Sequence, residues 1–196
     1  MNSVSIGCVV LAAGNAERFG ANKLAAEVQG RSLLARALDA VPVDALAAVC
    51  VVTQYDEAAR LAQRRGFEVV RNERAQDGLS RSVRLGTQAL QGRCDAIVFL
   101  VADQPLLRRA SVAALLDFYR DNSAQIVAAS HGAQRGNPCV FPRKYFAELC
   151  RLTGDVGGSA VIRAHAAELR LFELPARELR DVDTRAALDA LPPPED

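Results

Sequence analysis

Aromatic residues are scarce in this sequence, and tryptophan is absent. Seven phenylalanines and three tyrosines are scattered along 196 residues, which leaves no stacking platform for single-stranded nucleic acid. An excess of charge is missing too, because 24 basic residues face 23 acidic ones and no stretch concentrates lysine and arginine without acids between them. Nucleic-acid-binding surfaces need clustered positive charge, so we expect no nucleic-acid partner.

Long hydrophobic runs are also lacking. Every apolar run, Cys8 to Ala13 and Ala96 to Ala102 among them, falls far short of the roughly 20 apolar residues that cross a bilayer as a helix. No basic segment precedes the first apolar run, and Gly14 interrupts that run, so we see no secretory signal. We therefore expect a cytoplasmic protein without a membrane partner.

The sequence also lacks the cysteine and histidine spacings that are typical of disulfide frameworks and metal sites. The five cysteines are odd in number and widely spaced, and no CxxC pair occurs among them, which argues against a disulfide framework or a structural zinc site. The two histidines, His131 and His165, stand in no HExxH pattern. Reduced thiols in a cytoplasmic protein are the better interpretation.

What the sequence does contain is the balance of an ordinary globular protein, with 50% hydrophobic and 24% charged residues. A chain of 196 residues can bury a core without disulfides or metal, and it is most naturally a single domain. We assign residues 1–191 to this domain and expect the proline-rich residues 192–196 to form a frayed tail.

Two kinds of segment alternate along the chain. Short runs rich in β-branched residues predict buried strands, and the stretches between them have helical periodicity. The expected strands are 4–11, 48–53, 67–70, 96–101, 126–129, 140–141 and 169–174, and the expected helices are 32–40, 56–65, 79–90, 111–119, 143–152, 159–166 and 184–191. This alternation is typical of βαβ units, so we predict an α/β fold with a doubly wound, mostly parallel sheet.

A loop of small residues follows the first expected strand, between Leu11 and Lys23. Ligands bind beyond the carboxyl ends of strands in open α/β sheets, and small residues let backbone N–H groups approach a phosphate. Arg18 and Lys23 place two cations on this loop. Its spacing is neither a Walker A loop nor GxGxxG, and an ordinary turn with two solvated basic residues explains the loop alone equally well.

Acidic residues follow the fourth expected strand and precede the last helix. Asp103 ends the run Val-Phe-Leu-Val-Ala-Asp, where a carboxylate suits Mg²⁺, although a turn residue before Pro105 is the commoner explanation. Asp181 and Asp183 lie just before the closing helix, where Asp183 or Thr184 could simply cap it. Each feature alone favours a structural role, but their joint occurrence favours chemistry.

A series of motifs runs in order along nearly the whole chain. It starts with Leu11-Ala-Ala-Gly-(x3)-Arg-Phe-Gly-(x2)-Lys23. It continues through Asn72, Gly78-Leu-Ser-Arg-Ser-Val-(x2)-Gly86, Ala102-Asp-Gln-Pro105, Gly136-Asn-Pro138, Gly154-Asp-(x)-Gly157 and Asp181-Val-Asp-Thr184. This series resembles the nucleotidyltransferases that include the molybdenum cofactor guanylyl- and cytidylyltransferases. Ala-Ala-Gly and Gly-Leu-Ser-(x)-Ser-Val are similar to the cytidylyl branch, whereas the guanylyl branch tends to carry Ala-Gly-Gly.

The resemblance implies a Rossmann-like nucleotidyltransferase fold and the transfer of CMP from CTP to molybdenum-bearing molybdopterin, with release of pyrophosphate. Arg18 would hold the β- and γ-phosphates, and Lys23 would stabilise charge on the α-phosphate. Asp103 and Asp183 would hold Mg²⁺. The expected catalytic residues are therefore Arg18, Lys23 and Asp103.

The resemblance also assigns the two substrates to different loops. The backbone of Ala12 and Ala13 and the hydroxyl of Ser80 or Ser82 would recognise cytosine, although Ser80 is as readily a helix N-cap. The nucleotide contacts implied are Leu11, Ala12, Ala13, Gly14, Arg18, Lys23, Asn72, Gly78, Ser80 and Ser82. The residues implied for the pterin side are Gly136, Asn137, Pro138, Asp155 and Gly157.

Three functions stay open at this point. The first is the molybdenum cofactor cytidylyltransferase, whose product a molybdoenzyme would receive. The second is a cytidylyl- or uridylyltransferase for a sugar or polyol phosphate, which shares the first loop; the lack of a long β-arm insertion and the Gly154-Asp-Val-Gly stretch favour the pterin instead. The third is a non-catalytic cofactor-binding chaperone for a molybdoenzyme, in which Arg18, Lys23 and Asp103 would have no reason to occur together.

Overall fold

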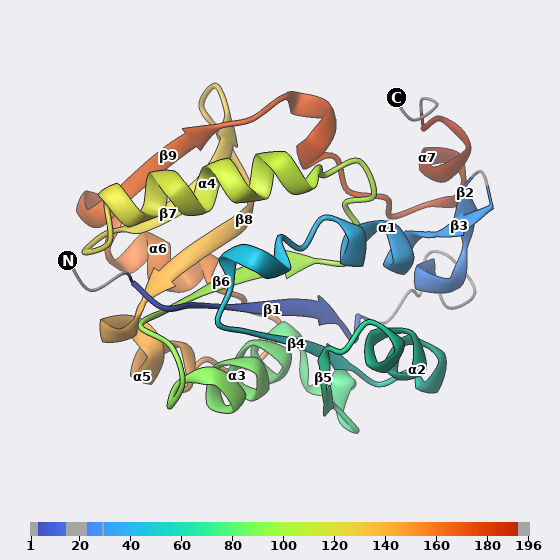
Figure 1. Cartoon of the computed structure of the whole chain (residues 1–196), viewed down its shortest axis with the longest axis horizontal. Coiled ribbons are helices and arrows are strands. Elements are labelled where there is room, and N and C mark those ends of the chain that lie inside the picture. Colours follow the sequence, from blue (N-terminus) through green and yellow to red (C-terminus); the bar gives the residue numbers. More distant parts are fainter. Residues whose placement is uncertain (1–3, 15–22, 29, 192–196) are drawn as a thin grey trace.

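The computed structural model describes residues 4–14, 23–28 and 30–191. A seven-stranded sheet forms its centre and helices cover both faces (Figure 1). The predicted α/β fold with a mostly parallel sheet is confirmed, since four of the six strand pairings in this sheet are parallel. Arg18 and the tail 192–196 lie outside the described residues.

The N-terminal half of the chain builds the parallel side of the sheet. β1 (Ile6–Ala12) lies between β4 (Ala48–Thr53) and β6 (Ala96–Val101), and β5 (Glu68–Arg71) pairs with β4. These four strands run in the same direction, so their carboxyl ends meet at one edge of the sheet. Any ligand site of the usual α/β kind therefore belongs at this edge.

A β-hairpin forms the other side of the sheet. β7 (Ile126–His131) and β8 (Gln134–Pro142) pair antiparallel, β8 lies against β6, and β9 (Leu169–Glu173) runs parallel to β7. The strand order is β5-β4-β1-β6-β8-β7-β9. The sequence predicted only 140–141 of β8, because its first half contains Gly136 and a proline, which carry no strand signal.

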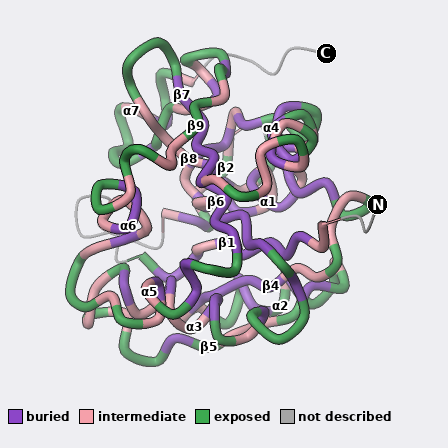
Figure 2. The backbone as a smooth tube through the Cα atoms, turned by 90° about the vertical axis from the view of Figure 1, so that its left-hand side faces the viewer, coloured by how far each residue is buried: buried purple, intermediate pink, exposed green. Residues whose placement is uncertain are grey.

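Alternate residues of the central strands face two separate cores. Cys8 and Val10 of β1 belong to the core under α1 (Leu33–Asp39), α2 (Asp56–Arg64) and α4 (Arg109–Asp121), whereas Val9 faces α3 (Leu79–Leu90), α5 (Phe146–Leu149) and α6 (Ser159–Ala164). A strand that is covered on both faces needs apolar residues at every position, as its sequence has. Figure 2 shows these strands buried through the middle of the molecule.

Smaller elements complete the chain. β2 (Glu27–Val28) and β3 (Arg31–Ser32) form a two-stranded ribbon before α1, and α7 (Arg185–Asp189) follows Thr184. Thr184 caps α7 by accepting a hydrogen bond from the Ala187 backbone N–H at 3.1 Å. The helix expected over 143–152 is shorter, because a 3-10 turn at Arg143–Tyr145 precedes α5. Among the described residues, no helix has the length and apolar character needed to cross a membrane.

Candidate functional site

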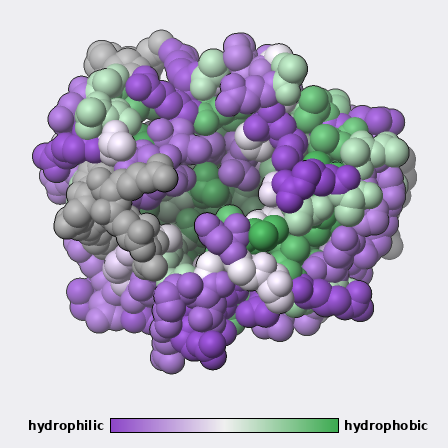
Figure 3. All heavy atoms as spheres, turned by 180° about the vertical axis from the view of Figure 1, so that it is seen from behind, coloured by the Kyte–Doolittle hydropathy of each residue, from purple (hydrophilic) through white to green (hydrophobic). Residues whose placement is uncertain are grey.

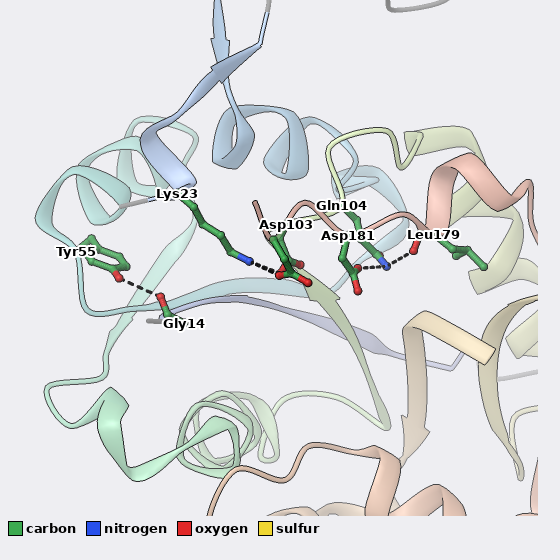
Figure 4. A network of polar contacts seen from close by, with 8 residues as sticks. Gly14, Lys23, Tyr55, Asp103, Gln104, Leu179 and Asp181 are labelled. Carbon is green, nitrogen blue, oxygen red and sulfur yellow. Dashed lines mark hydrogen bonds and ion pairs between the residues drawn. The ribbon is translucent and has the colours of Figure 1, made fainter. Parts of the chain in front are cut away.

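Lys23 lies between two carboxylates at the carboxyl edge of the sheet. Its Nζ atom is 2.8 Å from Asp103 Oδ2 (Figure 4) and 3.1 Å from Asp183 Oδ1. Lys23 starts a 3-10 helix, η2 (Lys23–Ala25), Asp103 follows β6, and Asp183 precedes α7. Three residues that the sequence placed in the site therefore come together from distant parts of the chain.

The charge of Lys23 is firmly held. Partial burial alone would lower the pKa of its ammonium group, but the charges of Asp103 and Asp183 and hydrogen bonds to them outweigh burial and raise this pKa above its ordinary value. The lysine side chain is 13% exposed, whereas Asp183 is 59% exposed. The cluster is thus closed on the lysine side and open to solvent beside Asp183.

Asp181 has a different partner from Asp183. The Gln104 side-chain amide donates from Nε2 to Asp181 Oδ1 at 2.9 Å and to the Leu179 carbonyl at 3.2 Å (Figure 4). Burial, followed by the charges of Asp103 and Asp183, raises the pKa of the Asp181 carboxyl, and the Gln104 hydrogen bond partly opposes that rise. Sequence reasoning quoted Gln104 only as part of a motif and assigned it no role.

Backbone and buried contacts fix the segment 178–183 against the end of β6. The Val182 N–H donates to the Asp103 carbonyl at 2.9 Å, and the Val182 side chain is fully buried in a small apolar cluster with Leu188. Glu178, at 0% exposure in η7 (Ala176–Leu179), accepts from the backbone N–H and Nε of Arg108 at 3.1 and 2.8 Å. The position of Asp183 therefore depends on several contacts besides its own side chain.

Residues after β4 hold the start of the first loop. Gln54 Nε2 donates to the Ala13 carbonyl at 2.7 Å, and the Tyr55 hydroxyl donates to the Gly14 carbonyl at 2.9 Å (Figure 4). Burial raises the pKa of Tyr55, and the nearby Lys23 charge partly offsets it. Sequence reasoning missed both residues, although they directly follow a correctly predicted strand beside β1.

The N-terminus of α3 is built by close contact with the loop at 154–155. The Leu79 N–H donates to Asp155 Oδ1 at 3.2 Å, and the Ser80 N–H donates to the Gly154 carbonyl at 3.3 Å. Gly78 precedes the helix with φ +93°, and a Cβ there would lie 2.5 Å from the Gly154 carbonyl. Asp155, which the resemblance assigned to the pterin side, thus contacts Leu79, which lies between Gly78 and Ser80 of the nucleotide side.

Two further nucleotide-side residues bind each other. Asn72 Nδ2 donates to Ser82 Oγ at 2.9 Å, and Arg81 Nε donates to Asn72 Oδ1 at 3.0 Å. Ser80 and Ser82 are both buried inside α3, so neither is its N-cap. This pairing orients the first turn of α3 toward the same sheet edge as Lys23.

Two cavities lie at this end of the sheet, one lined by Gln104 and Asp181 and the other by Leu11 and Val101. The larger, about 620 Å³, has both apolar and polar walls and includes Gln104, Asp181, Arg135 and Arg180. The smaller, about 220 Å³, is mainly apolar. Gly136 and Asn137 line both, and Gly157 lines the smaller one; Pro138 is buried beside them. Figure 3 shows a face of the molecule hollowed in this manner, with apolar residues at the floor and polar residues around it.

The arrangement suits a phosphorylated ligand and one divalent cation. No group of three or more histidine, cysteine or acidic side chains surrounds a common point in the described part of the chain. Mg²⁺, however, needs only one or two protein carboxylates when phosphates and water supply the remaining ligands. Asp103 and Asp183 already share one positive group, the Lys23 ammonium, so their oxygens are placed to hold a cation.

Fold and site together define an α/β domain with a charged cluster at the carboxyl edge of its sheet, the edge at which open α/β sheets bind their ligands. Family comparison makes this class specific: residues 8–169 match the MobA-like NTP transferase domain. The match spans most of the sequence, so the chain belongs to this family, and its activity class is nucleotidyl transfer. Among curated proteins, none matches the chain.

Solved structures share the whole fold. Rv0371c from Mycobacterium tuberculosis H37Rv is 25% identical with a TM-score of 0.80, covering 97% of this chain and 98% of that one. The complex of Rv0371c with manganese is 25% identical, with a TM-score of 0.76 and coverage of 95% and 97%. CMP:2-keto-3-deoxy-manno-octonic acid synthetase in complex with CTP is 17% identical, with a TM-score of 0.71 and coverage of 94% and 95%, a likeness of fold.

Proposed function

We propose that the protein transfers CMP from CTP to molybdenum-bearing molybdopterin and releases pyrophosphate. The observation that carries this proposal is the Lys23–Asp103–Asp183 cluster beside the first loop, because nucleotidyl transfer needs positive charge where phosphate charge develops. The ordered motifs of the cytidylyl branch support CTP as the nucleotide. A CTP complex is also known for a protein of the same fold.

In this reaction the terminal phosphate of the pterin is the nucleophile. Its oxygen forms a bond to the α-phosphorus of CTP, the bond from that phosphorus to the bridging oxygen breaks, and pyrophosphate leaves with the electron pair. Lys23 stabilises the charge on the α-phosphate, and Arg18 binds the β- and γ-phosphates. Positioning and electrostatics suffice, so no covalent intermediate with the protein is required.

Asp103 and Asp183 would hold Mg²⁺, which when bound neutralises phosphate charge and assists departure of pyrophosphate. The manganese complex of Rv0371c supports the use of a divalent cation by proteins of this kind. Asp181 is engaged by Gln104 and therefore plays no part in holding the cation in this proposal. The larger cavity, with Arg135 and Arg180 in its wall, would take the phosphate-bearing acceptor.

Cytosine would lie above the first turn of α3. The backbone of Ala12 and Ala13 and the Ser82 hydroxyl, which already accepts from Asn72, lie at this side of the sheet edge. A pocket bounded by these backbone groups would leave little room for a purine. We therefore expect CTP to be bound in preference to GTP.

The test is a transfer assay with radiolabelled CTP or GTP, Mg²⁺ and one acceptor at a time. The acceptors are molybdenum-loaded molybdopterin and a polyol phosphate, and Asp103→Asn serves as the inactive control. Label incorporated from CTP into the pterin alone is the expected result. Incorporation into the polyol phosphate, incorporation from GTP, or pterin binding without incorporation would each contradict the proposal and identify one of the alternatives.

A further inference from the structure

The Lys23 side chain occupies the position where the proposed function needs a divalent cation. Its Nζ atom contacts one oxygen of Asp103 and one of Asp183, at 2.8 and 3.1 Å. These are the two acids offered for the metal, and among the described groups the lysine is their shared cationic partner. A metal ion bound to both of these oxygens and the lysine ammonium cannot lie between the two carboxylates at the same time.

We propose that Lys23 is a resident counter-cation that closes the metal site until a nucleotide is bound. The inference rests on the proposed use of a divalent cation at Asp103 and Asp183. Without a nucleotide, a metal ion must displace the lysine from both acids, so metal alone binds weakly. The triphosphate of CTP offers the ammonium a new anionic partner, so Lys23 moves to the phosphates and leaves both acids to the metal.

The surroundings of Lys23 support a side chain that exchanges partners. Asp183 is 59% exposed, so solvent reaches the cluster and the ion pair is not permanently sealed. Asp181 is held by Gln104, so it does not follow Lys23 or replace Asp183 when the lysine leaves. The lysine therefore serves two sites in turn, the acids in the free protein and the phosphates in the complex.

The first experiment measures binding of Mn²⁺ alone, without nucleotide, by the electron paramagnetic resonance signal of the free ion. Lys23→Met removes the charge and keeps the length of the side chain. We expect its Kd for Mn²⁺ to be at least about fivefold lower than that of the wild type, because two ion pairs no longer compete with the metal. The same variant should bind CTP more weakly when EDTA removes all metal. If Lys23 only bound phosphate, the substitution would weaken CTP binding and leave the affinity for Mn²⁺ unchanged.

Lys144 provides a matched control because it is the other lysine of the chain. It pairs with Glu168, at a distance from the site, so Lys144→Met changes the net charge equally and should leave Mn²⁺ affinity at the wild-type value. Lys23→Arg, which keeps the charge, should also stay near wild type. Equal or weaker Mn²⁺ binding by Lys23→Met would overturn the inference.

The second experiment uses the wild-type protein and needs no variant. The lysines are acetylated with a small amine-reactive reagent, and the rate at each lysine is measured by mass spectrometry. Acetylation should become faster at Lys23 when Mn²⁺ is added, whereas Lys144 should keep its rate. No change at Lys23, or protection, would contradict displacement of the lysine. The transfer assay distinguishes the two proposals. If the wild type transfers CMP but the acetylation rate of Lys23 does not respond to Mn²⁺, only the counter-cation role is refuted. If the wild type transfers no CMP, the proposed function is refuted.

Discussion

At the scale of single residues, the two acids of the Asp-Val-Asp segment differ in what they contact. Asp183 contacts Lys23, whereas Asp181 accepts from Gln104. The sequence could not separate them, because both are aspartates just before the same helix. The distinction arises from Gln104. This residue follows strand β6 and is therefore far in the sequence from the two aspartates.

Asp183→Asn should therefore lose activity as severely as Asp103→Asn. Asp181 is engaged by Gln104 and does not compensate, although it is two residues away. We expect each of the two variants to lower turnover about a hundredfold or more at fixed Mg²⁺. Asp181→Asn, whose amide oxygen still accepts from Gln104, is the control and should keep most activity. A mild Asp183→Asn phenotype would show that Asp181 does replace it.

The raised pKa of Asp181 predicts a stability effect of opposite sign from that of an ion-paired aspartate, whose pKa is lowered. The folded protein holds this proton to a higher pH than the unfolded chain does, so the free energy of unfolding falls as pH rises from the ordinary aspartate pKa to the raised one. Asp181→Asn should consequently melt at a higher temperature than the wild type at pH 7. The difference should disappear below about pH 4. Melting curves for both proteins between pH 3.5 and about pH 8 test this, and an equal melting temperature at pH 7 would contradict it.

At the scale of elements, the hydrophobic pattern predicted the central strands well and the hairpin poorly. β4 and β6 were predicted with their observed bounds, because strands buried on both faces are apolar throughout. The first half of β8 is glycine-, asparagine- and proline-containing and lies beside the cavities, so its sequence reflects the site more than the sheet. The contact between 154–155 and α3 also carries no local signal, since it joins segments far apart.

Gly78→Ala should disturb that contact strongly. At φ +93° and ψ 175° the position suits glycine, and a Cβ would meet the Gly154 carbonyl at 2.5 Å. We expect a loss of about 3 kcal/mol in the free energy of unfolding, together with weaker nucleotide binding. Gly66→Ala is the control, because Gly66 has φ +75° but open space around its Cβ position. It should cost about 1 kcal/mol and leave nucleotide binding intact. Equal effects of the two substitutions would exclude a special role for the close approach.

At the scale of the whole molecule, the cysteines show how uniformly the sheet is covered. Cys8, Cys50 and Cys94 are buried, and Cys8 and Cys50 belong to opposite faces of the sheet. Burial raises the pKa of all three thiols, that of Cys50 to about 12. Cys150, the last cysteine, is half-buried. All five cysteines are free in the structure.

Alkylation of the native protein should therefore reach Cys150 first. Cys8, Cys50 and Cys94 should react only when the sheet opens, at rates that rise together with denaturant, because thiolates are the reactive form and the two cores that shield the three thiols are built on the same sheet. Pulse alkylation followed by peptide mass spectrometry gives each rate. Fast native-state labelling of Cys8 or Cys50 would show that the sheet opens locally rather than as one unit.

The candidate site itself was partly predictable from the sequence. The resemblance named Lys23, Asp103 and Asp183, and the structure brings them together. Gln104 and Tyr55 were assigned no role, because each acts through a neighbour that the chain brings close only on folding. Motifs thus predict the groups of the candidate site, whereas the side chains that position those groups are found only in the tertiary structure.

The three residues of the Lys23 cluster are synthesised at different times, because they are far apart in the sequence. Lys23 and Asp103 are 80 residues apart, and Lys23 and Asp183 are 160 apart. At a synthesis rate of about 5–20 residues per second, the lysine and its first acid exist for roughly 4–16 s before the second acid is made. A nascent chain that has not reached Asp183 contains the residues of β1, β4 and β6, yet it lacks half of the carboxylate pair that contacts Lys23. The cluster is thus complete only after translation has passed Asp183, close to the end of the chain.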